Sequence, residues 1–100
     1  MIHIVATVTV QESRRDDYLA IFTKYVPIVQ AEDGCIRYEP FVDVESGLGR
    51  QKPVRDNVVI VLETWESLEK LHAHIAAPHM AELKEELGDI VTDLDLQIVG

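Results

Sequence analysis

Residues 58–65 decide the fold of this chain, and they read Val58-Val-Ile-Val-Leu-Glu-Thr-Trp65. The first five residues are apolar and mostly β-branched, so the stretch favours a β-strand. It shows no alternation of apolar and polar residues until its end, which is typical of a strand covered on both faces. Residues 2–10 have a similar composition. These two stretches therefore predict the centre of a sheet that is buried on both sides.

The elements that flank the first strand are a long helix and an edge strand. A helix of about twenty residues is expected between Ser13, the predicted N-cap, and Gly34, because apolar residues recur at helical spacing between them. Pro27 lies inside this helix and predicts a bend. A strand follows at residues 35–44. Its Pro40 cannot donate a hydrogen bond to a neighbour, so this strand is expected at a sheet edge.

The second half of the chain predicts one loop, two helical stretches and a last strand. Residues 45–56 contain glycine, proline and basic residues without periodicity and are interpreted as a long hairpin loop. After the strand at 58–65, a helix is expected over residues 67–77 with its serine as N-cap. A further helical stretch begins at Pro78 and continues to about residue 87. Residues 92–99 are the last predicted strand.

The element order predicts an α+β domain, β-α-β-β-α-β, that spans residues 1–100. The right-handed crossover rule places both helices on one face of an antiparallel sheet, with the first and third strands in the middle. The other apolar face would then be bare. We therefore expect a homodimer packed sheet to sheet, the alternative being a single sheet with an unusually apolar outer face.

Composition excludes several kinds of partner. The formal net charge is −9, and only nine residues are Lys or Arg. Nucleic acids and anionic membrane surfaces need clustered basic residues, so neither is an expected partner. No signal peptide and no run of eighteen apolar residues is found, and the single cysteine, Cys35, fits a reducing compartment. We expect a soluble cytoplasmic protein.

Three histidines, His72, His74 and His79, fall within eight residues. Positions two apart on a helix point about 200° apart, and Pro78 separates the last histidine from the others, so no metal site is predicted. The buried stripe of this helix is predicted to consist of Leu68, Leu71 and Ile75. On that stripe His72 is buried first and His74 lies at the flank, although all three histidines could be ordinary helix residues.

Several motifs together resemble those of the antibiotic biosynthesis monooxygenase family. The resemblance covers nearly the whole chain and is strongest in three segments, Glu32-Asp-Gly-Cys35, Glu63-Thr-Trp65-Glu-Ser67 and Pro78-His79-Met80, with Tyr38, Leu71 and His74-Ile75 between them. Within the family, the chain is most similar to the bacterial quinol monooxygenases. The segments that support this are Val26-Pro27, Phe41-Val-Asp43 and the long basic hairpin.

The resemblance implies a ferredoxin-like fold in a dimeric α+β barrel, with an apolar pocket between each sheet and its helices. It also implies no metal and no cofactor. Matched position by position, His74 is the expected base, and Trp65 and Tyr38 are the expected stacking and hydrogen-bonding walls. The expected partners are a small aromatic substrate and oxygen. Further substrate contacts are expected from Phe22, Glu63, His79 and Met80.

The leading hypothesis is therefore oxidation of a small quinol or polyphenol by oxygen without a cofactor. Another branch of the family implies an isomerase acting on a phosphorylated hydroxypentanedione, which would need a cationic site such as Arg50, Lys52 and Arg55. Haem degradation in the family uses an asparagine on the first strand, and the only asparagine here is Asn57. A non-catalytic dimer that binds an aromatic ligand, and a loosely bound flavin, stay open.

Overall fold

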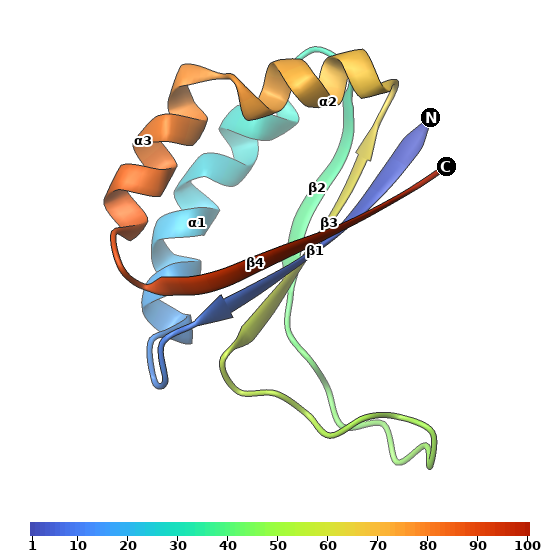
Figure 1. Ribbon diagram of the computed structural model, residues 1–100, viewed down its shortest axis with the longest axis vertical. Helices are drawn as coiled ribbons and strands as arrows, with labels where there is room; N and C mark the ends of the chain where they lie inside the picture. Colours follow the sequence, from blue (N-terminus) through green and yellow to red (C-terminus); the bar gives the residue numbers. More distant parts are fainter.

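A computed structural model describes residues 1–100 as one four-stranded sheet with three helices (Figure 1). The element order confirms the predicted α+β class. The bounds are β1 Ile2–Val10, α1 Arg15–Gln30, β2 Cys35–Phe41, β3 Val58–Trp65, α2 Leu68–Ile75, α3 Pro78–Leu87 and β4 Val91–Val99. The two helical stretches predicted for this half of the chain are α2 and α3, and α2 ends at Ile75, two residues before its predicted end.

The sheet has the order β2-β3-β1-β4, and all of its neighbouring strands are antiparallel. β1 and β3 lie in the middle and β2 at an edge, as the sequence predicted. The register pairs Ile4 with Glu63 and Ala6 with Val61 across the two central strands. All three helices lie on the same side of the sheet (Figure 1). This is the ferredoxin-like arrangement.

The two central strands differ in how their faces are covered. β3 is buried along almost its whole length, which confirms the prediction for residues 58–65. β1 alternates instead: Ile4, Ala6, Val8 and Val10 are buried under the helices, while the side chains between them are exposed or half-buried. Burial of the outer face of β1 was expected from a second chain and stays a prediction, because these exposures are those of a single chain.

Three predicted boundaries were also wrong. The N-cap of α1 is Arg14 and makes no side-chain hydrogen bond, while Ser13 adopts a left-handed backbone with φ of 66°. The helix ends at Gln30, before the glycine that was expected to end it. β2 ends at Phe41 rather than at residue 44. In contrast, Ser67 caps α2 as predicted and accepts a hydrogen bond from the Lys70 backbone N–H.

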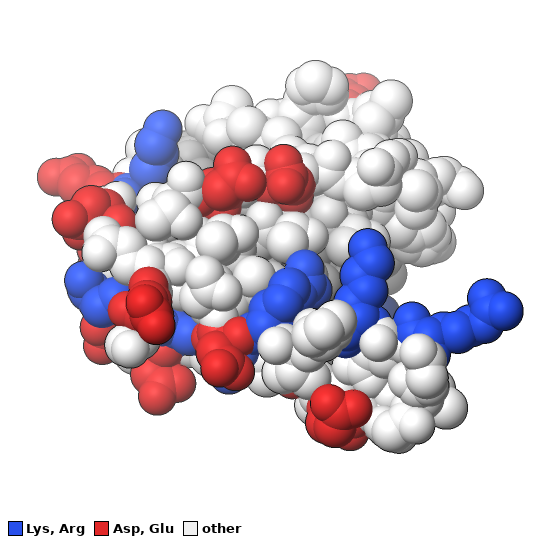
Figure 2. All heavy atoms as spheres, turned by 60° about the horizontal axis from the view of Figure 1, so that its bottom comes forward, with Lys and Arg blue, Asp and Glu red and all other residues white.

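The segment between β2 and β3 is a long hairpin loop that extends away from the helices (Figure 1). Figure 2 views this end of the molecule and shows several Lys and Arg side chains beside one another, with acidic residues around them. Arg55 is anchored at the base of the loop, because it donates two side-chain hydrogen bonds to Asp43. No helix of the structure has the length and apolarity required to cross a membrane.

Candidate active site

The main cavity lies between the helices and the inner face of the sheet and has a volume of about 580 Å³. Sixteen of its twenty lining residues are hydrophobic, so the cavity favours an apolar ligand. β4 supplies one wall through Leu94, Leu96 and Ile98, whose side chains remain about half exposed. The cavity is therefore open along this strand. Its volume is in the usual range for small-molecule sites.

A row of aromatic rings runs along one side of the cavity. Tyr18 and Phe22, one turn apart on α1, have ring centroids 5.3 Å apart, and Phe22 stacks on Tyr38 of β2 at 5.5 Å. The edge of Tyr38 meets the imidazole of His74 at 5.4 Å, and Trp65 lies 4.6 Å from the same imidazole. Rings at these separations attract one another and order the wall. A flat aromatic ligand would find a preformed surface here.

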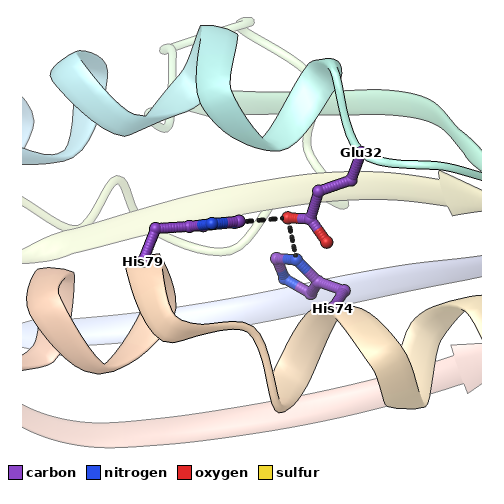
Figure 3. Close-up of side chains that lie close together, drawn as sticks. All are labelled: Glu32, His74 and His79. Atoms are coloured by element: carbon purple, nitrogen blue, oxygen red, sulfur yellow. Dashed lines mark hydrogen bonds and ion pairs between the residues drawn. The ribbon is translucent and has the colours of Figure 1, made fainter.

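His74 stands at the end of this row, in the last turn of α2, and only 3 % of it is exposed. Its Nδ1 is 2.8 Å from Oε2 of Glu32, which lies two residues after the end of α1 (Figure 3). Because the carboxylate is an acceptor, this contact assigns the proton to Nδ1 and leaves a lone pair on Nε2. His74 also lines the cavity. The arrangement is that of a general base oriented by a carboxylate.

The same carboxylate oxygen is shared with a second histidine. Nε2 of His79, in the first turn of α3, lies 2.7 Å from Oε2 of Glu32 (Figure 3). The break between α2 and α3 turns the chain so that both imidazoles face this carboxylate. Glu32 itself is held by the turn at Gly34, whose φ of 85° suits a glycine and whose Cβ position would clash with the Lys70 side chain.

Glu63 adds a second carboxyl group on the other side of His74. It projects from β3 into the cavity, and its Oε1 accepts a 3.0 Å hydrogen bond from the Trp65 indole N–H and lies 3.9 Å from Nε2 of His74. Burial raises the pKa of Glu63 above its usual value, although the Trp65 hydrogen bond and the nearby His74 work in the opposite direction. Glu63 is therefore a proton-binding group at the wall of the cavity.

Two phenol hydroxyls complete the polar part of the site. Tyr18 and Tyr38 are each 3 % exposed and line the cavity, and neither hydroxyl makes a hydrogen bond within the protein. Burial first, and then the negative charge of Glu63, raises the pKa of both phenols, so both remain protonated. They are donors available to an oxygen atom of a ligand.

The structure brings most of the predicted site residues together. Tyr38, Glu63, His74, Phe22 and Met80 all line the cavity. Two others lie behind its wall. Trp65 is completely buried and contacts the site through Glu63 and His74, so it is not a stacking surface, and His79 contacts Glu32 instead of the cavity.

The prediction that His72 is buried before His74 was wrong. His72 is exposed, and the inner face of α2 carries Leu71 and His74, because Leu68 and Ile75 are 54 % and 57 % exposed. Two residues of the site were missed. Glu32 was quoted only as part of a motif, and Tyr18 is one of the residues at helical spacing between Ser13 and Gly34, to which no role was given. The four-residue spacing of Tyr18 and Phe22 could have indicated that both line one cavity.

Glu32, His74 and His79 are also the residues that could hold a metal ion. One donor atom from each lies within 4.8 Å of the other two. Pro78 separates His74 from His79 in sequence and was expected to prevent a metal site, but the two imidazoles contact the same carboxylate oxygen. Two imidazoles and a carboxylate are a donor set that suits zinc and other divalent transition metals.

The fold and this site define a class of small ferredoxin-like α+β domains with an apolar cavity, and comparison with known proteins identifies the family. The family model described as antibiotic biosynthesis monooxygenase matches residues 1–86. The chain therefore belongs to the antibiotic biosynthesis monooxygenase family, as its motifs implied.

Among its relatives is the Escherichia coli protein "Probable quinol monooxygenase YgiN", which is 33 % identical over 99 % of this chain and 96 % of the relative. Solved structures agree on the fold. The Deinococcus radiodurans protein described as "a putative antibiotic biosynthesis monooxygenase" has a TM-score of 0.80 at 21 % identity, and the match covers 100 % of this chain and 91 % of that chain. Rv0793 from Mycobacterium tuberculosis has a TM-score of 0.79 at 17 % identity, with 99 % and 92 % covered.

Proposed function

We propose that this protein is a monooxygenase that oxidises a small quinol or related polyphenol with molecular oxygen and no cofactor. The observation that carries the proposal is the His74 imidazole, whose Nδ1 is bonded to Glu32 and whose ring lines an apolar cavity. Family membership and the similarity to a quinol monooxygenase support the same substrate class. Phe22 and Tyr38 provide the aromatic wall on which the ring would lie.

The proposed chemistry begins with removal of a phenolic proton by Nε2 of His74. Oxygen reacts slowly with a neutral quinol, whereas the anion gives up an electron readily, so deprotonation in a cavity that excludes water starts the reaction. The overall reaction is quinol plus O₂ to hydroxyquinone plus water. One oxygen atom enters the ring, the other leaves as water, and the quinol supplies all four electrons. Glu63 and the phenol of Tyr38 face the same cavity and can hydrogen-bond the substrate oxygens.

The test is oxygen uptake with an anaerobically reduced quinol such as menadiol, measured with and without the protein. His74→Ala should lower kcat/KM by about 100-fold or more, the usual contribution of a general base. Glu32→Gln should lower it less, because His74 remains in place but loses its carboxylate partner. His72→Ala, an exposed histidine two residues away, is the matched control and should retain full activity. If the protein and its His74→Ala variant both leave the rate of oxygen uptake unchanged, the proposal fails.

We also propose that two chains associate through the outer face of the sheet. This face pairs Val5 with Leu62 and Thr7 with Ile60, and all of these side chains are half-buried or exposed in the single chain. Val5, Ile60 and Leu62 form an apolar strip along the two central strands, which a second chain would cover. The helices and the cavity lie on the opposite side, so a second chain would support the sheet without entering the site.

The competing activities have less support. A phosphorylated isomerase substrate needs a cationic pocket, but Lys84 is the only Lys or Arg that lines the main cavity. Arg55 and Lys52 line a separate small cavity at the loop, and the guanidinium of Arg55 is already paired with Asp43. A non-catalytic dimer that binds an aromatic ligand would show tight binding without turnover across a panel of quinols.

A further inference from the structure

The cluster of Glu32, His74 and His79 adjoins the main cavity at the His74 ring, which lines that cavity. Neither Glu32 nor His79 lines the cavity, and the donor atoms face one another between the end of α1, the end of α2 and the start of α3 (Figure 3). The side chains of Glu32 and His79 are 15 % and 21 % exposed, whereas that of His74 is 4 % exposed. The cluster is thus reached from the surface and not through the cavity.

We propose that this cluster is a binding site for a divalent transition-metal ion of the zinc type. Zinc takes imidazole nitrogen and carboxylate oxygen at about 2.0–2.2 Å, with three protein ligands and an open fourth position in many sites. Tetrahedral donors at that distance lie about 3.3 Å apart. The present Nδ1–Oε2 and Nε2–Oε2 distances are 2.8 and 2.7 Å, and all donors are within 4.8 Å, so side-chain shifts of about 1 Å create the site.

Two further features support a cation here. The formal net charge of the chain is −9, which raises the local concentration of cations around the protein. Two ring nitrogens already face the same carboxylate oxygen, and both can ligate a metal ion once their protons move to the opposite nitrogens of the two rings. The metal would also join three elements, α1, α2 and α3, that are otherwise separate in sequence.

Metal binding at Nδ1 of His74 would change the role of His74 as a base. A metal ion on Nδ1 uses the lone pair on that atom, so the neutral imidazole must carry its proton on Nε2, the nitrogen nearer Glu63. In that form His74 donates a hydrogen bond to a ligand and accepts no proton. The site would therefore inhibit deprotonation of a substrate, and this regulatory part rests on the proposed function, whereas the binding itself does not.

Binding is tested on the full chain without any substrate. After removal of metals by a chelator, Zn²⁺ is added in equilibrium dialysis and Co²⁺ in visible absorption, where a four-coordinate site gives a distinct d–d band. One ion should bind per chain. Glu32→Gln and His79→Gln should weaken binding by at least about 100-fold, the upper range for loss of a supporting group at a metal site. His72→Gln, an exposed histidine of the same region, should bind as the wild type does.

Thermal unfolding shows whether a variant fails to bind Zn²⁺ because it has lost a ligand or because it is misfolded. Zn²⁺ should raise the Tm of the wild type and of His72→Gln, because an ion that binds only the folded state stabilises it, and should leave the Tm of Glu32→Gln unchanged. Equal binding by all variants, or a loss in His72→Gln equal to that in His79→Gln, would overturn the site. Binding of fewer than one ion per chain at a saturating concentration would do the same.

Inhibition is tested separately with oxygen uptake. If the proposed activity is observed, Zn²⁺ should inhibit it over the concentration range in which dialysis shows binding. The activity that remains in His79→Gln should not be inhibited by Zn²⁺ at these concentrations. If Zn²⁺ binds but does not inhibit, the proposal that the metal regulates the activity is overturned, while the metal site itself is retained. If no quinol is oxidised at all, the proposed function fails, and the dialysis result still decides whether the metal site exists.

Discussion

Glu63 is the residue at which stability and function are opposed. It is buried in an apolar wall, and the pKa of its carboxyl group is raised mainly by this burial. Because its pKa is raised, Glu63 holds a proton more tightly in the folded protein than in the unfolded chain. This stabilises the folded state fully at a pH below the usual pKa of glutamate. The stabilisation is lost as the pH rises through the raised pKa of the folded state. At neutral pH the protein therefore retains a carboxyl group that does not favour folding, which is a common property of functional sites.

Glu63→Gln should remove the destabilisation that the buried carboxyl group causes at neutral pH. Glutamine keeps an acceptor for the Trp65 indole N–H but carries no charge, so the variant should unfold at higher urea concentration than the wild type at pH 8. The difference should shrink toward about pH 4, the usual range for glutamate. Glu66→Gln, an exposed neighbour, is the control. A constant difference between pH 4 and pH 8 would contradict the assignment.

Cys35 is predicted to be a slow nucleophile. Burial, together with the negative charges of Glu32 and Glu63, raises the pKa of its thiol to about 11. At pH 8 the thiolate fraction is then far below that of a free cysteine, even though each thiolate is more nucleophilic. Alkylation by iodoacetamide at pH 8 should be at least about tenfold slower than for a cysteine in a short peptide. The rate should return to the peptide value in denaturing urea, and a fast reaction of the folded protein would contradict this.

At the scale of elements, the sequence predicted which segments form helices and strands better than where the helices begin. The strand at 58–65 and the helix at 78–87 were predicted with their observed bounds, because their composition and the N1 proline are strong local signals. Ser13 was predicted as a cap from its residue type, with Asp16 three residues further on. In the structure the chain turns through a left-handed backbone at this serine, which a type-based rule cannot detect.

The two serines give a matched pair of variants. Ser67→Ala removes the side-chain oxygen that accepts the Lys70 N–H at 3.2 Å, and should lower the free energy of unfolding by about 1 kcal/mol. Ser13→Gly removes no cap and relieves a positive φ, so it should be neutral or slightly stabilising. Urea unfolding of both variants measures the contrast. Equal destabilisation by the two changes would contradict the assignment of the caps.

The site was less predictable than the fold, and the reason lies in tertiary geometry. Glu32 and His74 are 42 positions apart in sequence, and no periodicity relates them. His74 is buried instead of His72 because of the way α2 is rotated against the sheet. The positions of Leu68, Leu71 and Ile75 in the sequence did not define this rotation. The motifs pointed to His74, Glu63 and Tyr38 by family resemblance. Only the structure shows that His74 and His79 share the carboxylate of Glu32.

At the scale of the whole molecule, the outer face of the sheet predicts the state of assembly. If two chains pack through it, native mass spectrometry at micromolar concentration should give twice the 11.3 kDa of one chain. Leu62→Glu places a charge on this face and should shift the protein to monomer, because an unpaired buried charge is costly. Ile28→Glu, at a 46 % exposed position on α1, is the control. A monomeric wild type would remove this surface as an interface.

The two ends of the chain lie beside each other because β1 and β4 are neighbours in the sheet, where His3 is paired with Val99 (Figure 1). The hairpin between β2 and β3 extends from the molecule, and its Gly47 and Gly49 have open space around them. Closely spaced ends and an exposed loop tip are the conditions under which circular permutation succeeds. A short linker from Gly100 to Met1, with new ends opened near Gly49, would therefore preserve every strand pairing. The same loop is thus a natural place to insert a reporter domain at a distance from the helices.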